Sequence, residues 1–293
     1  MNFIFVGDSI VRRFAVVSLL VFSVLTLCMG NSQAEVLSQP GVLDSSFRIE
    51  FLFGTQSFSY SGATSIRGDF NIRVPLLAGT VELSPSPLIS GRFAGAISIF
   101  ERSGSMMRDP NYTGLTDFVR WQVEPDLGSW EFAGLYHLWT GGGYRYSIVA
   151  GYRQETWRHR GEAVNSEGRS RDEFASQIPF LGLQTSMFFP WWKARFEVLG
   201  SPFMTRRVSN SLQERGQIID YSGELSQGGL LEFQMEGNVA VTQNIWCGLH
   251  ARYLHQELRG DVSGTINDVP TGVRVLSVAD SIVTVGVDFT LLF

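Results

Sequence analysis

The chain ends on a segment whose side chains alternate in kind, SIVTVGVDFTLLF, from Ser281 to Phe293. Apolar residues fill every second position from Val283 onward, and polar residues such as Thr284 and Asp288 stand between them. A period of two predicts a β-strand, because successive side chains of a strand point to opposite faces. The apolar face of this strand must meet either a buried core or lipid, and that choice limits what the whole chain can fold into.

The beginning of the chain has the features of a secretory signal peptide. Two arginines precede an uncharged run over residues 14–28, and small residues lead up to Ala34. Such an order is typical of a signal peptide and its cleavage site. The run is short for a bilayer core of about 30 Å, which disfavours a transmembrane anchor. We therefore expect residues 1–34 to be a signal peptide and residues 35–293 to form the exported protein.

The composition of the exported part narrows its class. Aromatic residues make up 13% of the chain, and the net charge is −5, which argues against a nucleic-acid partner. No later segment approaches the roughly 18 consecutive apolar residues of a membrane helix. Cys247 is the one cysteine after the signal peptide, so no intrachain disulfide is expected. An exported β-rich chain of this kind is either a periplasmic sandwich or an outer-membrane barrel.

The faces of further alternating segments favour the barrel. In the segment 230–241, Leu231 and Phe233 point one way, and Glu232 and Glu236 point the other way. Aromatic residues near strand ends are typical of the interfacial girdles of membrane barrels. They are Tyr144, Tyr146, Trp191, Trp192, Trp246 and Tyr253. We therefore predict an all-β protein, a single antiparallel transmembrane β-barrel.

Counting alternating segments predicts about ten strands, and the even number agrees with a barrel. We place them at 46–58, 67–83, 88–102, 128–139, 144–160, 176–189, 191–206, 228–242, 245–260 and 281–293. Short connections alternate with long polar stretches, near 59–66, 103–127, 161–175, 207–227 and 261–280. Short turns are typical of the periplasmic side and longer loops of the extracellular side, so both termini should be periplasmic.

A barrel of this size is too narrow for a wide pore, because eight strands are already filled by side chains and porins need about sixteen. An unpaired charge in a narrow lumen costs several kcal/mol, so inward charges of both signs should pair into an ionic plug. A conducting path or proton relay is the alternative. We predict these inward-facing polar residues: Arg48, Glu50, Asn71, Arg73, Arg92, Glu131, His137, Arg145, Arg153, Lys193, Arg195, Glu197, Glu232, Glu236, His250, Arg252 and Asp288.

Several hairpins resemble those of the omptins, which are ten-stranded outer-membrane proteases. The similar segments are PLLAGTVELSPSPLISGRFAGAISI, GGYRYSIVAGYRQETW, IPFLGLQTSMFF, NVAVTQNIWCGLHARYL and VTVGVDFTLLF. The resemblance spans nearly the whole exported chain and implies the ten-stranded architecture. It also implies a protease centre in which an Asp pair and an Asp–His pair activate water across an extracellular cleft.

The sequence departs from the omptin centre at both pairs. Asp109 matches the first aspartate of the Asp pair, but Asn111 stands where the second aspartate is expected. The stretch expected to carry the Asp–His pair, residues 205–229, contains Asp220 but no histidine. A neutral asparagine cannot take a proton from water, so the general base that the chemistry needs is missing from this pattern.

A displaced centre is one alternative to the loss of activity. His159 is the histidine predicted to face inward near the rim, where Asp109 or Asp172 could partner it. A solvated loop histidine in an arginine-rich rim is the simpler interpretation. No metal-ligand spacing and no cofactor motif stands out in the sequence, so neither a metal nor a cofactor is expected.

Arginines gather in two of the predicted extracellular loops. They are Arg158, Arg160, Arg169 and Arg171 in one, and Arg206 and Arg207 in the other. Guanidinium groups bind phosphate bidentately, which suggests contact with lipopolysaccharide or another anionic partner. Ordinary solvated charge is the alternative, since acidic residues lie nearby: Glu155, Glu162, Glu167, Asp172 and Glu173.

The sequence therefore predicts an omptin-like barrel in the outer membrane of a Gram-negative bacterium, exposed at the cell surface and without a recognisable protease centre. Its role would be structural, binding or surface interaction. The alternative is a surface hydrolase, an omptin-like endopeptidase or a lipid-modifying enzyme, with a rearranged rim site. Expected partners are outer-membrane lipids, including lipopolysaccharide, and the barrel assembly machinery through Phe293. We expect a monomer.

Overall fold

The computed structural model describes residues 45–62, 67–99, 106–109, 119–163, 168–214 and 216–293. The described residues up to Leu292 belong to one compact unit. The expected signal peptide, residues 1–34, lies outside the described residues. No helix in the described ranges is long and apolar enough to cross a membrane.

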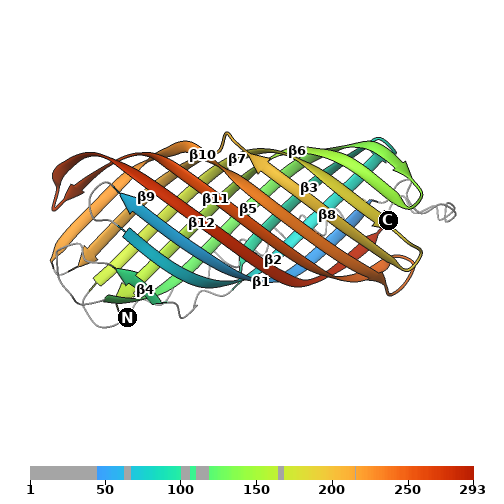
Figure 1. Cartoon of the computed structure of the whole chain (residues 1–293). Coiled ribbons are helices and arrows are strands. Elements are labelled where there is room, and N and C mark those ends of the chain that lie inside the picture. Colours follow the sequence, from blue (N-terminus) through green and yellow to red (C-terminus); the bar gives the residue numbers. More distant parts are fainter. Residues whose placement is uncertain (1–44, 63–66, 100–105, 110–118, 164–167, 215) are drawn as a thin grey trace. The chain divides into compact units, whose positions relative to one another are not determined.

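The described residues form twelve β-strands, as labelled in Figure 1. They are β1 (Ser46–Gly62), β2 (Arg67–Ser86), β3 (Ile89–Ser98), β4 (Met106–Asp109), β5 (Val119–Gly141), β6 (Tyr144–Ala163), β7 (Gly168–Phe188), β8 (Trp192–Ser201), β9 (Thr205–Glu214), β10 (Gln217–Ala240), β11 (Ile245–Ile266) and β12 (Val269–Leu292).

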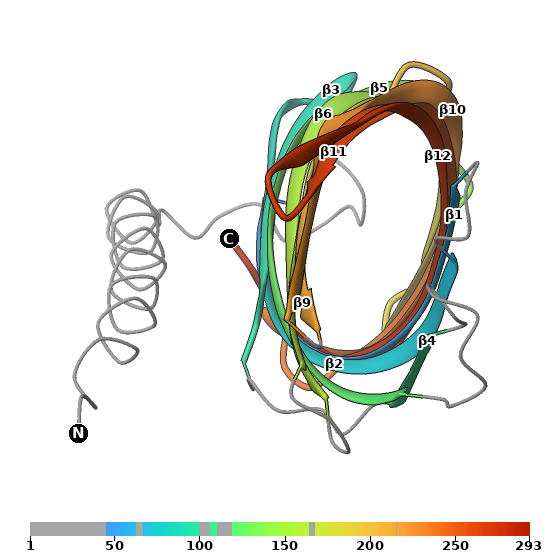
Figure 2. The ribbon, with the colours of Figure 1, turned by 90° about the vertical axis from the view of Figure 1, so that its left-hand side faces the viewer.

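The strands close into a ring in which all neighbours run antiparallel. The order is β1-β12-β11-β10-β8-β7-β6-β5-β3-β2, and β1 also pairs with β2. β9 pairs with the same neighbours as β8, and β4 with the same neighbours as β3, so the twelve strands occupy 12 − 2 = 10 positions. Viewed end-on, the wall of this unit is oval (Figure 2). The predicted ten-stranded antiparallel barrel is confirmed.

The strands extend well beyond the predicted boundaries at one end of the barrel. β10 begins at Gln217 rather than near residue 228, and β12 begins at Val269 rather than near residue 281. Much of what the polar composition suggested as loop is therefore strand. The predicted strand boundaries are wrong at this end because the apolar side chains move there from the outer face to the inner face, although the period of two continues.

β12 shows this exchange along a single strand. In the C-terminal half of β12, Val283, Val285 and Val287 are exposed on the outer face. In its N-terminal half, Leu276 and Val278 are buried on the inner face. A strand in lipid turns apolar side chains outward, and a strand in water turns them inward. One half of the barrel is thus built for lipid and the other half for water.

The lipid-facing half carries a band of exposed apolar side chains with aromatic edges. Leu183 on β7 and Phe233 on β10 belong to this band. At the short-turn edge the rings of Trp139 and Tyr146 lie 5.7 Å apart. At the opposite edge those of Trp130 and Tyr152 lie 5.6 Å apart. Of the aromatic residues expected at the edges, Tyr146, Trp191 and Tyr253 are exposed on the outer face. Trp246 was expected there too, but it is buried on the lumen side, where its ring lies beside Lys193.

A β-bulge in β10 lies in the region where the apolar side chains move from the outer face to the inner face. The register between β10 and β11 shifts between Leu225 and Gln227, opposite the break between β8 and β9. Gly228 has a φ of 142°, a conformation that L side chains rarely adopt. Because the bulge adds one residue, Leu225 and Leu230 both face inward although their numbers differ in parity.

A charge placed in the apolar band should destabilise the barrel, and the same charge above the band should not. Leu183→Arg should lower the free energy of unfolding by about 2–4 kcal/mol, because an arginine side chain would face the hydrocarbon. Gln177→Arg, on the same face of β7 but beyond the band, should change it by about 0.5 kcal/mol or less. Denaturant titration in lipid vesicles measures both values. Equal effects would contradict this placement of the band.

Candidate functional site: a filled lumen and a basic outer wall

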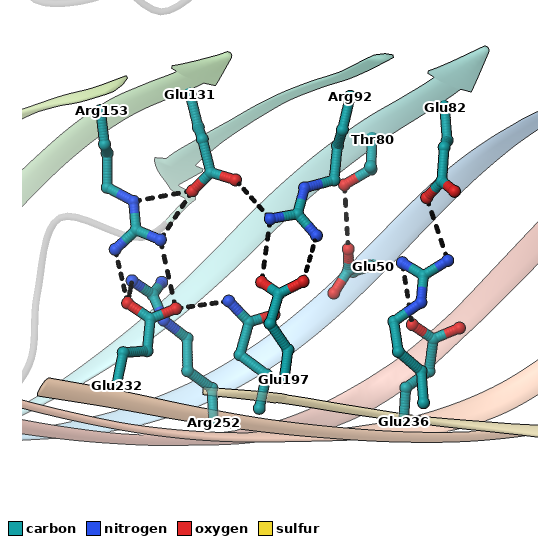
Figure 3. A network of polar contacts seen from close by, with 12 residues as sticks. Glu50, Thr80, Glu82, Arg92, Glu131, Arg153, Glu197, Glu232, Glu236 and Arg252 are labelled. Atoms are coloured by element: carbon teal, nitrogen blue, oxygen red, sulfur yellow. Dashed lines mark hydrogen bonds and ion pairs between the residues drawn. The ribbon is translucent and has the colours of Figure 1, made fainter. Parts of the chain in front are cut away.

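The lumen of the lipid-facing half is crossed by a network of arginines and glutamates (Figure 3). Arg92 on β3 bonds Glu197 on the opposite wall at 2.7 Å and Glu131 at 3.0 Å. Arg153 on β6 bonds Glu131 at 2.6 Å and Glu232 on β10 at 2.5 Å. Each guanidinium thus joins two carboxylates that come from different strands.

A second part of the network lies beside the first and also joins distant strands. Arg48 forms ion pairs with Glu50 at 2.9 Å and with Glu236 of β10. The imidazole Nδ1 of His250 lies 2.7 Å from the Glu50 carboxylate. Arg195 of β8 bonds Glu82 of β2 at 3.0 Å. These contacts hold opposite walls together, and the predicted ionic pairing of the lumen is confirmed.

Most residues of this network were predicted from the sequence to face inward. One residue predicted to face inward faces outward, and two buried acidic residues were not predicted. Arg73, predicted to face inward, is exposed on the outer face of β2. Glu82 and Glu155 were not predicted, yet both are buried in the lumen. The alternation of the strands could have placed both residues, because Glu82 lies two positions from Thr80 and Glu155 two positions from Arg153, on the same face in each case. The side chain of Asn71 lies outside the described residues.

A hydrogen-bonded chain of hydroxyls and one imidazole lies toward the end of the lumen where β12 ends. His137 contacts Ser90 Oγ at 2.7 Å through Nε2 and Ser147 Oγ at 2.8 Å through Nδ1. Ser90 Oγ lies 2.9 Å from Ser84 Oγ. Both ring nitrogens of this buried histidine are therefore engaged within the wall.

The half of the lumen that lies beyond the apolar band is filled by an apolar core. Its members come from nearly every strand and include Leu52, Trp157, Leu225, Leu258 and Leu276. Side chains from opposite walls pack directly against one another.

The structure brings His159 and Asp172 together inside this core. They stand directly opposite each other in the β6–β7 pairing. His159 is 1% exposed and Asp172 is 3% exposed. Ring centroids of Phe58 and Phe174 lie 5.9 Å and 5.8 Å from the imidazole. Asp109 lies on β4, where its backbone pairs with β5, and its side chain lies outside the described residues.

Burial sets the protonation of this pair, which lies beyond the apolar band. Desolvation, reinforced by the positive charge of Arg206, lowers the pKa of His159 to about 3. Desolvation raises the pKa of Asp172 to about 7. At neutral pH the imidazole is uncharged and the carboxyl keeps its proton part of the time. Because both side chains are shielded from solvent, the pair is poorly placed to activate a water molecule.

Arg206 also belongs to the interior. It is 1% exposed, donates to Ser176 Oγ at 2.8 Å and lies 3.9 Å from the carboxylate of Asp280. Asp280 in turn accepts hydrogen bonds from Gln56 at 3.1 Å and Gln256 at 2.9 Å. Arg206 is therefore a structural cation of the core and does not reach the outer surface.

The other arginines proposed as a binding cluster face outward above the apolar band. They are Arg158, Arg160, Arg169, Arg171 and Arg207. Arg158 pairs with Glu173 at 3.3 Å, and Arg207 lies 3.7 Å from Glu224. Arg160 and Arg171 stand directly opposite each other on β6 and β7. This arrangement forms a basic outer wall.

Two of the acids expected to balance these arginines do not reach that wall. Glu155 and Asp172 are buried in the lumen. Glu162 and Glu173 face outward with the arginines, and Glu124 stands opposite Arg160 on β5. The outer wall thus keeps some acidic neighbours but fewer than the sequence suggested. Among the described residues, no group of three or more metal-binding side chains occurs.

The chain is similar to several solved barrels. It resembles the outer membrane protease OmpT of Escherichia coli with a TM-score of 0.68 and 15% identity, over 88% of this chain and 99% of that chain. The translocator domain of the autotransporter NalP from Neisseria meningitidis has a TM-score of 0.36 and 9% identity, over 94% and 96% of the two chains. No protein-family model matches the sequence, and no curated protein sequence matches it.

The fold and its likenesses define the class of this protein. It is an antiparallel transmembrane β-barrel with an apolar outer band, and it shares its fold with the outer membrane protease OmpT. The omptin resemblance expected from the hairpin sequences is confirmed for the architecture. At 15% identity the likeness concerns the fold alone, because one fold can carry many functions.

Removing one member of the lumen network should be costly. Arg153→Leu would leave Glu131 and Glu232 buried with less positive charge, and loss of one partner of a buried pair costs about 3–5 kcal/mol. Arg207→Leu removes an exposed arginine from a pair of the same kind on the outer wall, where pairs contribute about 0–1 kcal/mol. Denaturant unfolding in vesicles compares the two variants. A similar small loss in both would show that the network contributes little.

The buried His159–Asp172 pair should give opposite pH dependences to two variants. The raised pKa of Asp172 contributes stability that is lost as pH rises through about 7, and Asp172→Asn removes that loss. The lowered pKa of His159 contributes stability that is lost as pH falls below about 6.5 toward 3, and His159→Phe removes that loss.

Between pH 4 and 7, the free energy of unfolding relative to the parent protein should therefore rise with pH for Asp172→Asn. It should fall with pH for His159→Phe. The slopes should not exceed about 1.4 kcal/mol per pH unit, the value for one proton. Parallel, flat differences in both variants would mean that neither group is buried in the folded barrel.

Proposed function

We propose that this protein is a non-conducting barrel of the outer membrane of a Gram-negative bacterium, whose surface-exposed outer wall binds anionic lipopolysaccharide. The role is one of binding and surface interaction rather than catalysis. Phe293, at the end of an alternating strand, would serve recognition by the barrel assembly machinery. The barrel would act as a monomer, since closure leaves no free sheet edge that needs a partner.

The filling of the lumen supports the non-conducting part of the proposal. The lipid-facing half is crossed by ion pairs such as Arg92–Glu197, and the other half is packed with apolar side chains such as Leu258. An ion would have to break paired charges and then cross a dry apolar layer, and both steps are costly. This arrangement favours a structural plug over the alternative of a conducting path.

The single observation that carries the binding role is the facing of Arg160 and Arg171. They stand opposite each other on the outer wall, and like charges in direct cross-strand positions are destabilising. A bound phosphate would convert this repulsion into two charge-assisted contacts. The outer leaflet presents phosphate groups on lipopolysaccharide just above the hydrocarbon, where this wall lies. Arg158 and Arg169 flank the pair on the same face.

The surface-hydrolase alternative has weaker support. Its proposed histidine and aspartate, His159 and Asp172, are shielded from water by aromatic rings. Asn111 replaces a carboxylate of the omptin pattern, and residues 205–229 contain no histidine. A peptide or lipid substrate would need to reach an acid–base pair, and these residues do not offer one at the surface.

Removing the facing arginines should weaken lipopolysaccharide binding. We expect Arg160→Gln with Arg171→Gln to raise the dissociation constant about tenfold, equivalent to about 1.4 kcal/mol. The loss should shrink at high salt, because exposed charge contacts are screened. Binding of purified, detergent-folded protein to lipopolysaccharide can be measured by microscale thermophoresis, with a dephosphorylated lipid A as the second ligand.

The matched control removes two exposed arginines elsewhere, Arg73→Gln with Arg259→Gln, and changes the net charge equally. It should bind nearly as tightly as the parent protein. Equal weakening in both double variants would point to net charge alone and contradict a site on the β6–β7 wall. Equal affinity of the parent protein for the dephosphorylated lipid would also contradict phosphate recognition.

A further inference from the structure

A chamber lies inside the barrel where the ionic network meets the apolar core. Its volume is about 90 Å³. Charged side chains of the network, among them Arg92 and Glu131, line one part of it. Apolar side chains of the core, among them Leu76 and Leu127, line the other part. The chamber exists because one wall carries only small side chains, Ala94 and Ala96 included.

Among the lining residues that are at most 4% exposed, four hold buried polar atoms without a hydrogen-bond partner in the described part of the chain. They are Arg92 (Nε), Glu155 (Oε2), Trp157 (Nε1) and Thr284 (Oγ1). A buried polar atom left unsatisfied costs about 1–3 kcal/mol, so four around one chamber point to a ligand that satisfies them.

The charged side chains around the chamber already pair with one another, which disfavours a single anion or cation as its occupant. Each lining arginine already has a carboxylate partner: Arg48 has Glu50, Arg92 has Glu131, Arg153 has Glu131, and Arg252 has Glu232. An anion would meet these carboxylates without an excess of positive charge. A cation needs several oxygen ligands, and Glu155 Oε2 is the one carboxylate oxygen among the four partnerless atoms.

The unsatisfied atoms call for a neutral molecule that both donates and accepts. Arg92 Nε and Trp157 Nε1 are donors, Glu155 Oε2 is an acceptor, and the Thr284 hydroxyl can act as either. We propose that the chamber is a binding site for an ordered cluster of water, on the order of three molecules by its volume. The cluster joins the ionic network to the indole of Trp157 and separates the network from the dry core above it.

The proposal predicts that buried leucines at the chamber react as if they touched water. Synchrotron X-ray radiolysis oxidises side chains next to bound water even when bulk solvent cannot reach them. Leu76 and Leu127 line the chamber and are 5% exposed, whereas Leu230 is 7% exposed and does not line it. In the folded parent protein we expect Leu76 and Leu127 to be oxidised several-fold faster than Leu230. Equal rates for the three leucines would overturn the proposal.

A filled chamber provides the matched variant. Ala96→Leu should place a larger side chain in the water site, so the excess oxidation of Leu76 and Leu127 should disappear while that of Leu230 stays unchanged. Persistence of the excess in a folded Ala96→Leu barrel would place the reactive water elsewhere and overturn the proposal. Ala94→Val offers a smaller substitution on the same wall if Ala96→Leu does not fold.

A high-resolution crystal structure distinguishes water from other occupants. We expect electron density within hydrogen-bond distance of Trp157 Nε1 and Glu155 Oε2, and no anomalous signal there after a bromide soak. A bromide peak in the chamber would replace the water cluster by an anion site. A chamber without density would show that the four polar atoms are tolerated dry, which also contradicts the proposal.

Discussion

The medium outside each strand changes from lipid to water along its length, and the rest of the structure follows from that change. In lipid the outer face must be apolar, so polar and charged side chains turn inward and have to satisfy one another. In water the outer face can be polar, and the apolar side chains turn inward instead. β12 carries both solutions, with Val285 outside in one half and Val278 inside in the other.

This exchange produces two different interiors in one barrel. In the lipid-facing half, Arg92 and Arg153 each donate hydrogen bonds to two carboxylates that come from different strands. Pairs of this kind compensate a large desolvation cost more than they add net stability. In the other half, packing of residues such as Leu258 and Trp157 supplies the cohesion. The two halves of the interior are therefore held together by different interactions.

The likeness to OmpT concerns the architecture. In this barrel, apolar side chains from different walls fill the interior beyond the apolar band, and His159 and Asp172 are buried among them. On the outside of the barrel, Arg160 and Arg171 face each other. A binding surface on the wall and a plug within it are consistent with one another, because neither requires the lumen to open.

The sequence by itself determined the period of two, the ten strand positions and the sign of the charges near the barrel mid-section. Residues such as Glu232 and Arg153 were placed correctly because lipid leaves only one face for a charge. Only the tertiary structure showed how the half of the barrel beyond the apolar band is built, including the burial of Asp172 and Arg206 and the length of β10. A period of two is unchanged when the two faces exchange roles. Only the packing of opposite walls reveals which face is inside.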